Sequence, residues 1–182
     1  MRKNLLIAVS VLVLFCSVIF ALTLAKATVE ELTQESTLIV HGTVQKIENQ
    51  WENQDEGTIN SFVTIDVFEY IKGMDESSLV IKQMGGHIGD WGDVIPGTPV
   101  FSKGDEVVLF LVKHQNFYEI HSIALGLFRV YEDDLGQKMV MNDLRNINLI
   151  DPITGNPVAG NEANPAFTLS LFRGQIRSYL SD

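Results

Sequence analysis

The chain has 182 residues, with 23 acidic and 13 basic side chains and a net charge of −10. This length suits one domain with a single core, and the acidic balance disfavours nucleic acid and anionic lipid headgroups as partners, because basic side chains bind both. Since its single cysteine is Cys16, the rest of the chain has no disulfide framework and no thiolate metal site.

The first 27 residues have the pattern of an export signal. A basic start precedes an apolar run over residues 5–24, and Ala25-Lys26-Ala27 offers a cleavage site made of small residues. The apolar part of a signal peptide is ordinarily about 7 to 15 residues long, whereas this run is long enough to cross a membrane. Residues 1–27 are therefore predicted to be a signal peptide or a retained signal anchor. In both cases residues 28 onward lie outside the cytoplasm.

A domain of mainly β structure is predicted over residues 28–150. Thr28 and Glu31 have the spacing of a capping box, which predicts a short helix of about Val29–Glu35. Apolar runs bounded by turn residues then indicate strands. These strands are expected over residues 36–48, 61–71, 79–84, 104–114, 117–123, 125–132 and 137–142.

The strand over residues 104–114 is expected at the centre of the sheet. Its continuous apolar run, residues 107–112, indicates burial on both faces. Gln115-Asn116 predicts a tight hairpin to the following strand. Gly42 predicts a bulge in the first strand, and the polar segment 49–60 predicts a loop.

The C-terminal part of the chain predicts a connection followed by a helix. Residues 151–164 are rich in Pro, Gly and Asn, which is typical of a connection. Asn164-Pro165 offers an N-cap and a first-turn proline for a helix over residues 165–182. Apolar residues at helical spacing are expected to pack this helix on the β domain, namely Leu169, Phe172, Ile176 and Leu180.

Short strands separated by frequent turns favour a small antiparallel barrel, because closure removes exposed strand edges. A β-sandwich is the alternative. The residues that carry a family resemblance include Ile71-Lys72-Gly73 and Gly104-Asp105-Glu106, within segments 37–44, 63–73, 104–111 and 126–130. Over about residues 30–132, the chain resembles uncharacterised bacterial exported proteins with OB-like (Greek-key) barrels. It is more distantly similar to netrin-like domains and to tissue inhibitors of metalloproteinases.

The resemblance implies a non-catalytic OB-like barrel, with a short N-terminal and a C-terminal helix, that binds a partner through its loops. The inhibitors chelate the zinc of their target with an N-terminal cysteine. Here Thr28 would be the first residue after cleavage, and no cysteine follows it. Inhibition by that route is therefore excluded.

The binding region is predicted in the loop over residues 85–101. This loop is too long and too rich in Gly and Pro for a simple connection, and it carries both aromatic and acidic residues. The candidate ligand-binding or partner-binding residues are His87, Asp90, Trp91, Asp93 and Phe101. The alternative is that Trp91 and Phe101 plug the barrel.

No motif predicts a catalytic residue, a metal site or a cofactor. Solvated positions are expected for the other three histidines, His41, His114 and His121. The expected function is an exported, non-catalytic binding module for an extracellular or envelope protein or a glycan. The alternatives are a hydrolase-like extracytoplasmic enzyme with a convergent site, or a protease inhibitor acting through a barrel loop. Contact with a membrane is expected only through residues 5–24, if the signal is retained.

The N-terminal pattern gives a direct test. Mass spectrometry of the protein released by its host should show Thr28 as the first residue. A full-length chain in the membrane fraction would establish the anchor, and a chain confined to the cytoplasm would contradict both forms of export.

Overall fold

The structure is a computed structural model that describes residues 23–25, 27–73, 79–142, 144, 147–151, 153–158 and 166–181. Residues 1–22 of the expected export signal, and the expected cap Asn164-Pro165, lie outside this set. The described elements are β1 (Thr23–Ala25), α2 (Val29–Glu35), β2 (Leu38–Asn53), β3 (Thr58–Lys72), β4 (Leu79–Met84), β5 (Gly86–Ile88), β6 (Trp91–Asp93), β7 (Glu106–His114), β8 (Phe117–Ile120), β9 (Leu127–Glu132), β10 (Lys138–Met141), β11 (Asn148–Ile150), β12 (Pro157–Val158), β13 (Phe167–Thr168) and α4 (Leu169–Tyr179).

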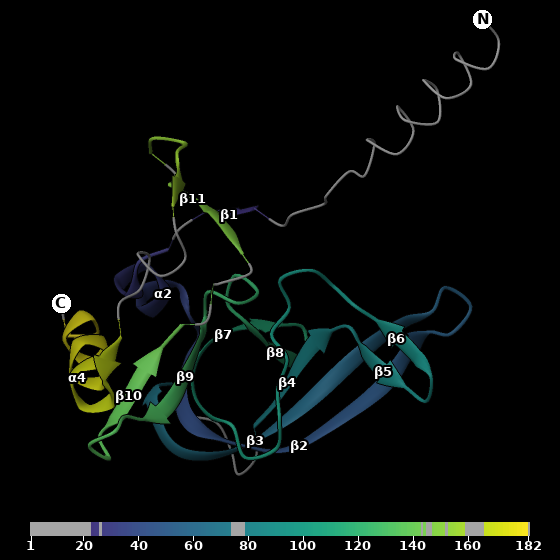
Figure 1. Cartoon of the computed structure of the whole chain (residues 1–182), viewed down its shortest axis with the longest axis horizontal. Helices are drawn as coiled ribbons and strands as arrows, with labels where there is room; N and C mark the ends of the chain where they lie inside the picture. The colour runs from purple at the N-terminus through teal and green to yellow at the C-terminus, as the bar shows by residue number, and fades with distance from the viewer. Residues whose placement is uncertain are drawn as a thin grey trace, which may run out of the picture.

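A ring of strands forms the centre of the molecule (Figure 1). Its order is β7-β2-β3-β4-β8, and β8 pairs back with β7 to close it. Neighbouring strands are antiparallel except β4 and β8, which run parallel and pair at one position, Ile81 with Tyr118. A small, partly open ring of this kind is an OB-like Greek-key barrel. The prediction of a mainly β, OB-like fold with one helix near each end of the domain is confirmed.

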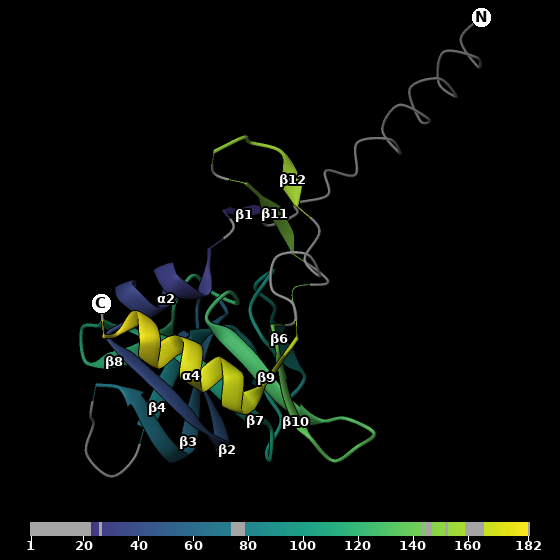
Figure 2. The same ribbon diagram turned by 90° about the vertical axis from the view of Figure 1, so that its left-hand side faces the viewer.

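The sheet continues beyond the ring, and two helices cover this extension. Strands β9, β10 and β13 add to the β7 edge in that order. Figure 2 shows α4 lying across the sheet with α2 beside it. The arrangement makes two hydrophobic cores, one inside the barrel and one between the sheet and the helices.

The central strand β7 contributes to both cores. Val107, Leu109 and Leu111 face the barrel interior, whereas Val108 and Phe110 pack under the helices. All five are fully buried. The predicted burial on both faces is confirmed, as is the β7–β8 hairpin across Gln115-Asn116.

Strands β2 and β3 are longer than predicted. They pair as far as Asn53 and Thr58, so the expected loop over residues 49–60 is wrong. The polar side chains there sit on a two-stranded arm, where one face remains in contact with water and apolar residues are not required. The predicted bulge at Gly42 is confirmed by a register shift, and a Cβ there would lie 2.5 Å from the Asp66 carbonyl oxygen.

Helix α2 begins as its capping box predicts. The Glu31 backbone N–H donates to Thr28 Oγ1 at 3.1 Å, and the Thr28 backbone N–H donates to Glu31 Oε2 at 2.7 Å. The hydrogen bonds from the backbone and the hydroxyl of Thr28 lower the pKa of the Glu31 carboxyl. At the other end of α2, Lys72 Nζ donates to the carbonyl oxygens of Thr33 and Gln34.

Helix α4 begins later than predicted, at Leu169 rather than near residue 165. Thr168 is its N-cap, because its Oγ1 accepts from the Leu171 backbone N–H, and β13 immediately before it pairs with β10. Leu169, Phe172 and Ile176 are buried as expected. Leu180 is 39% exposed because the helix ends at Tyr179, so its predicted place in the buried stripe is wrong.

A small separate sheet has the order β1-β11-β12. Strand β12 lies within residues 151–164, which were expected to be a connection only. Strand β1 lies within the expected export signal and runs parallel to β11. In the described ranges, neither helix has the length and apolar character needed to cross a membrane.

Two of the histidines expected in solvent are largely buried. His41 is 7% exposed, and its Nε2 lies 2.8 Å from Glu106 Oε1. His121 Nε2 lies 3.1 Å from Glu35 Oε2, with little of its side chain exposed. A carboxylate partner makes burial of each ring tolerable. Only His114 is exposed as predicted.

The Glu106 carboxylate also accepts from Lys138 Nζ, at 2.7 and 2.8 Å. Burial by itself raises the pKa of Glu106, but the hydrogen bonds from Lys138 and His41 outweigh it, so the pKa is lowered. This ionic group joins β2, β7 and β10 on the outside of the barrel.

The docking of α4 gives a test of the core between the sheet and the helices. Phe172 is fully buried, with its ring centroid 4.6 Å from that of Phe128. Phe172→Ala should cost about 3 to 5 kcal/mol and lower the melting temperature by about 10 °C. Leu171→Ala, an exposed position one residue away, is the control and should change stability little. Equal melting temperatures for the two variants would mean that α4 is not docked.

Candidate functional site

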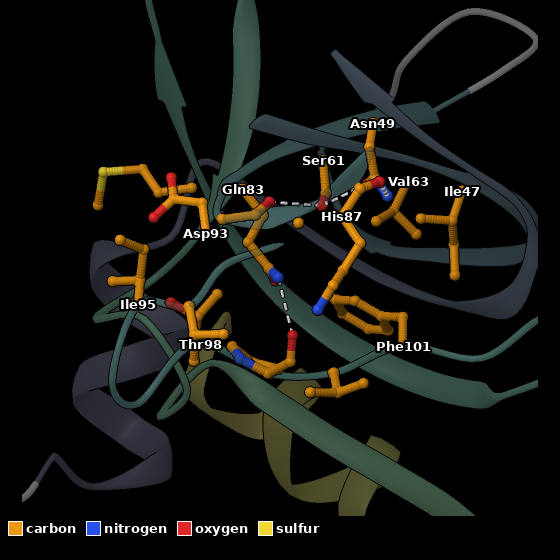
Figure 3. A pocket seen from close by; sticks show the side chains of 16 residues that line it. Ile47, Asn49, Ser61, Val63, Gln83, His87, Asp93, Ile95, Thr98 and Phe101 are labelled. Carbon is orange, nitrogen blue, oxygen red and sulfur yellow. Dashed lines mark hydrogen bonds between the residues drawn. The ribbon is translucent and has the colours of Figure 1, made fainter. Parts of the chain in front are cut away.

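A pocket of about 200 Å³ lies at one end of the barrel, beneath the loop over residues 85–101. Figure 3 shows the side chains that surround it. Strands β2, β3 and β4 supply the wall and the loop supplies the cover. The labelled lining residues are Ile47, Asn49, Ser61, Val63, Gln83, His87, Asp93, Ile95, Thr98 and Phe101.

The first half of the loop is fixed to the barrel through a hairpin. Strands β5 and β6 form a short antiparallel hairpin. Ile59 in β3 contacts both sides of this hairpin, since its carbonyl oxygen accepts from the Gly85 N–H at 2.8 Å and its N–H donates to Asp93 Oδ2 at 2.9 Å. Gly85 has a φ of 89°, and a Cβ there would lie 2.9 Å from the Asp93 carbonyl oxygen. The close approach of the hairpin therefore requires glycine at this position.

Three polar side chains form a row across the wall. Asn49, Ser61 and Gln83 are direct cross-strand neighbours on β2, β3 and β4. Ser61 Oγ donates to the Gly85 carbonyl oxygen at 2.6 Å and lies 2.8 Å from Asn49 Oδ1. Asn49 Nδ2 donates to the His87 carbonyl oxygen at 2.8 Å. Two members of the row are thus committed to holding the loop.

Gln83, the third member of the row, has an unused group. Its Nε2 donates to the Pro99 carbonyl oxygen at 2.8 Å. Its Oε1 is buried and has no hydrogen-bond partner among the described residues. A buried acceptor without a donor costs about 1 to 3 kcal/mol. Because Oε1 itself has almost no surface open to solvent, a bound N–H or O–H group would satisfy it only after a small shift of the Gln83 side chain.

The predicted site residues fall into two groups. His87, Asp93 and Phe101 line the pocket. Phe101 is 9% exposed and belongs to the barrel core. The Asp93 carboxylate accepts a hydrogen bond from the Ile59 backbone N–H. Asp90 and Trp91 do not line it. Asp90 is exposed at the β5–β6 turn.

Trp91 lies over the turn between β2 and β3, outside the pocket. Its side chain is 57% exposed, and its Nε1 donates to the Gly57 carbonyl oxygen at 3.4 Å. The ring centroid lies 6.4 Å from that of Trp51 on the arm. The loop thus presents an exposed aromatic surface beside the β2–β3 arm. Three further apolar side chains at the pocket, Met84, Val94 and Val100, are also exposed.

Asn49, Ser61 and Gln83 were not predicted as site residues. Each lies two positions from a residue that lines the barrel or the pocket with an apolar side chain, Ile47, Val63 or Ile81. Because strand side chains alternate with a period of two, these polar residues continue the inward-facing positions of their strands. This alternation is the sequence signal that could have identified the three polar residues as part of the site.

Comparison with protein-family models gives no match, and comparison with curated proteins gives none either. Within the part of the chain that the structure describes, no group of three His, Cys, Asp or Glu side chains is placed to hold a metal ion.

The burial difference between the two aromatic residues of the loop gives a paired test. Phe101→Ala should destabilise the protein by about 3 to 5 kcal/mol, because it leaves a cavity in the barrel core. Trp91→Ala should cost less than about 1 kcal/mol, because its ring is mostly in solvent. Chemical denaturation of both variants measures the difference. A large loss for Trp91→Ala would show that this ring is packing and would remove it as a recognition surface.

Proposed function

We propose that the protein is an exported, non-catalytic binding module. It captures a protein partner through one side chain, apolar except for a single hydrogen-bond donor, that inserts into the pocket beneath residues 85–101. The observation that carries this proposal is the buried, unpartnered Oε1 of Gln83, a residue that lines a pocket with apolar walls. Ligand sites commonly combine an apolar lining with a few placed polar groups.

The lining indicates what chemistry the pocket accepts. Ile47, Val63 and Ile95 offer apolar surface, which favours a group that leaves water with a gain in free energy. A ligand with one hydrogen-bond donor that reaches Gln83 Oε1, through a small shift of that side chain, would also satisfy this buried acceptor. An indole ring with its N–H meets both conditions.

The same geometry favours a protein partner over a glycan. A sugar carries many hydroxyl groups and needs several free donors and acceptors, whereas Asn49 and Ser61 already bond to the loop backbone. The exposed side chains of Met84, Val94 and Val100 suit the apolar rim of a protein contact. Trp91 extends that surface towards the arm, as aromatic anchors of interfaces do.

Export and loop-mediated binding rest on the sequence. The basic start, apolar run and small-residue site of residues 1–27 support export. The resemblance to exported OB-like barrels supports recognition through a loop. Export and loop-mediated binding are parts of the proposed function whose tests do not depend on ligand binding in the pocket.

Indole and 1-methylindole provide a matched pair of probes, since they differ in the N–H donor. In a chemical-shift titration of the exported protein, indole should bind about fivefold more tightly than 1-methylindole. This ratio corresponds to the free energy of one hydrogen bond. Gln83→Met keeps the size of the side chain and removes the acceptor. This variant should bind the two probes equally.

Gln83 also contacts Pro99, so the melting temperature and the loop amide signals of Gln83→Met serve as the control for an altered loop. Equal affinity of the wild-type protein for both probes would overturn the role of Gln83. If the protein binds to a glycan array and does not respond to indole, the partner is a carbohydrate rather than a protein.

A further inference from the structure

A second pocket, of about 330 Å³, adjoins the first one. Gln83 and Pro99 line both pockets, and the hydrogen bond between them lies at the boundary. The other residues that line the second pocket include the charged side chains of Lys82 and Glu119 and the apolar side chains of Ile120 and Ile123. The remainder are Glu52, Met84, Thr98, His114 and Gln115. Met84 and Thr98 also line both pockets, but charged side chains such as Lys82 and Glu119 line only the second.

The opening follows from the way the barrel closes. Strand β4 pairs with β3 along its whole length, Leu79–Met84, but with β8 only at Ile81. After Ile81 the strands separate, so Lys82 and Gln83 on one side and Glu119 on the other border an open seam.

The backbone beside the seam is held in an unfavourable conformation. Ser122 and Ile123 have φ values of 50° and 61°. A positive φ is rare for a β-branched residue and persists only where the surrounding structure imposes it. Hydrogen bonds from the Leu125 N–H to the Ser122 carbonyl oxygen and from the Gly126 N–H to the His121 carbonyl oxygen fix this turn. Ile123 is thereby kept in the wall of the second pocket.

The charges around this cavity are not balanced. Lys82 Nζ lies 3.5 Å from Glu52 Oε1, so these two side chains form a pair. Glu119 is partly buried, and although its backbone pairs with Val112 of β7, its carboxylate has neither a hydrogen bond nor an ion pair with any residue in the described ranges. The Glu119 carboxylate, which lies beside apolar side chains, is therefore free to pair with a ligand.

We propose that this seam pocket is a second binding site, for an organic cation in which a guanidinium or ammonium group is attached to an apolar stem. Glu119 is the counter-ion, and Ile120, Ile123 and Pro99 contact the stem. A guanidinium fits a carboxylate with two parallel hydrogen bonds, and its methylene groups pack on apolar walls. The acidic chain, with a net charge of −10, also raises the local concentration of cations. This inference does not depend on the first pocket or its ligand.

The probes are arginine and citrulline, each acetylated at the amino group and amidated at the carboxyl group. They have nearly the same shape and differ in charge. Titration of the exported protein at physiological ionic strength should show capped arginine binding about tenfold more tightly, in line with a charge-assisted hydrogen bond. The amide signals of Lys82, Glu119 and Ile120 should move.

Glu119→Gln should remove the preference for arginine, and Glu119→Asp, which keeps the charge, should retain part of it. Glu132→Gln is the matched control, because it makes the same change in net charge at an exposed position of β9 outside the pocket. The inference is overturned if citrulline binds as well as arginine, if Glu119→Gln binds like the wild type, or if the shifts map away from the seam.

Discussion

Strands β2 and β7 pair from Leu38 with Leu111 to Thr43 with Glu106, and both carry apolar side chains on two faces. One face lines the barrel and the other lies under the helices. The pair is thus a shared wall between two cores, and burial of apolar surface on both sides stabilises the same backbone ladder. The barrel, the helical layer and the strands that carry both pockets all depend on this wall.

Local signals in the sequence predicted the elements that have strong local causes. The continuous apolar run of β7, the bounded run of β4 and the Thr28–Glu31 capping box each specify their element from neighbouring residues. The β2–β3 arm escaped prediction because cross-strand pairing, not composition, holds its polar residues. The start of α4 depends on the pairing of β13 with β10, which is a contact between distant segments.

The site was predictable only in part, for the same reason. The composition of residues 85–101 marked the loop, and His87, Asp93 and Phe101 do line the pocket beneath it. The row of Asn49, Ser61 and Gln83 exists only in the observed register, since a slip of one residue turns a side chain to the other face. Neither the register nor the open seam is visible in the order of the residues.

The closure of the ring through one residue pair also bears on how the protein opens. Strand β8 is held to β4 only between Ile81 and Tyr118, whereas β7 has strand partners on both edges. Backbone amides beside the seam can therefore exchange their hydrogens through a local opening that breaks one bridge. Those in the middle of β7 become accessible only when both cores come apart. Hydrogen exchange should thus divide this single barrel into a slow wall and a fast seam, with the cavity lined by Glu119 on the fast side.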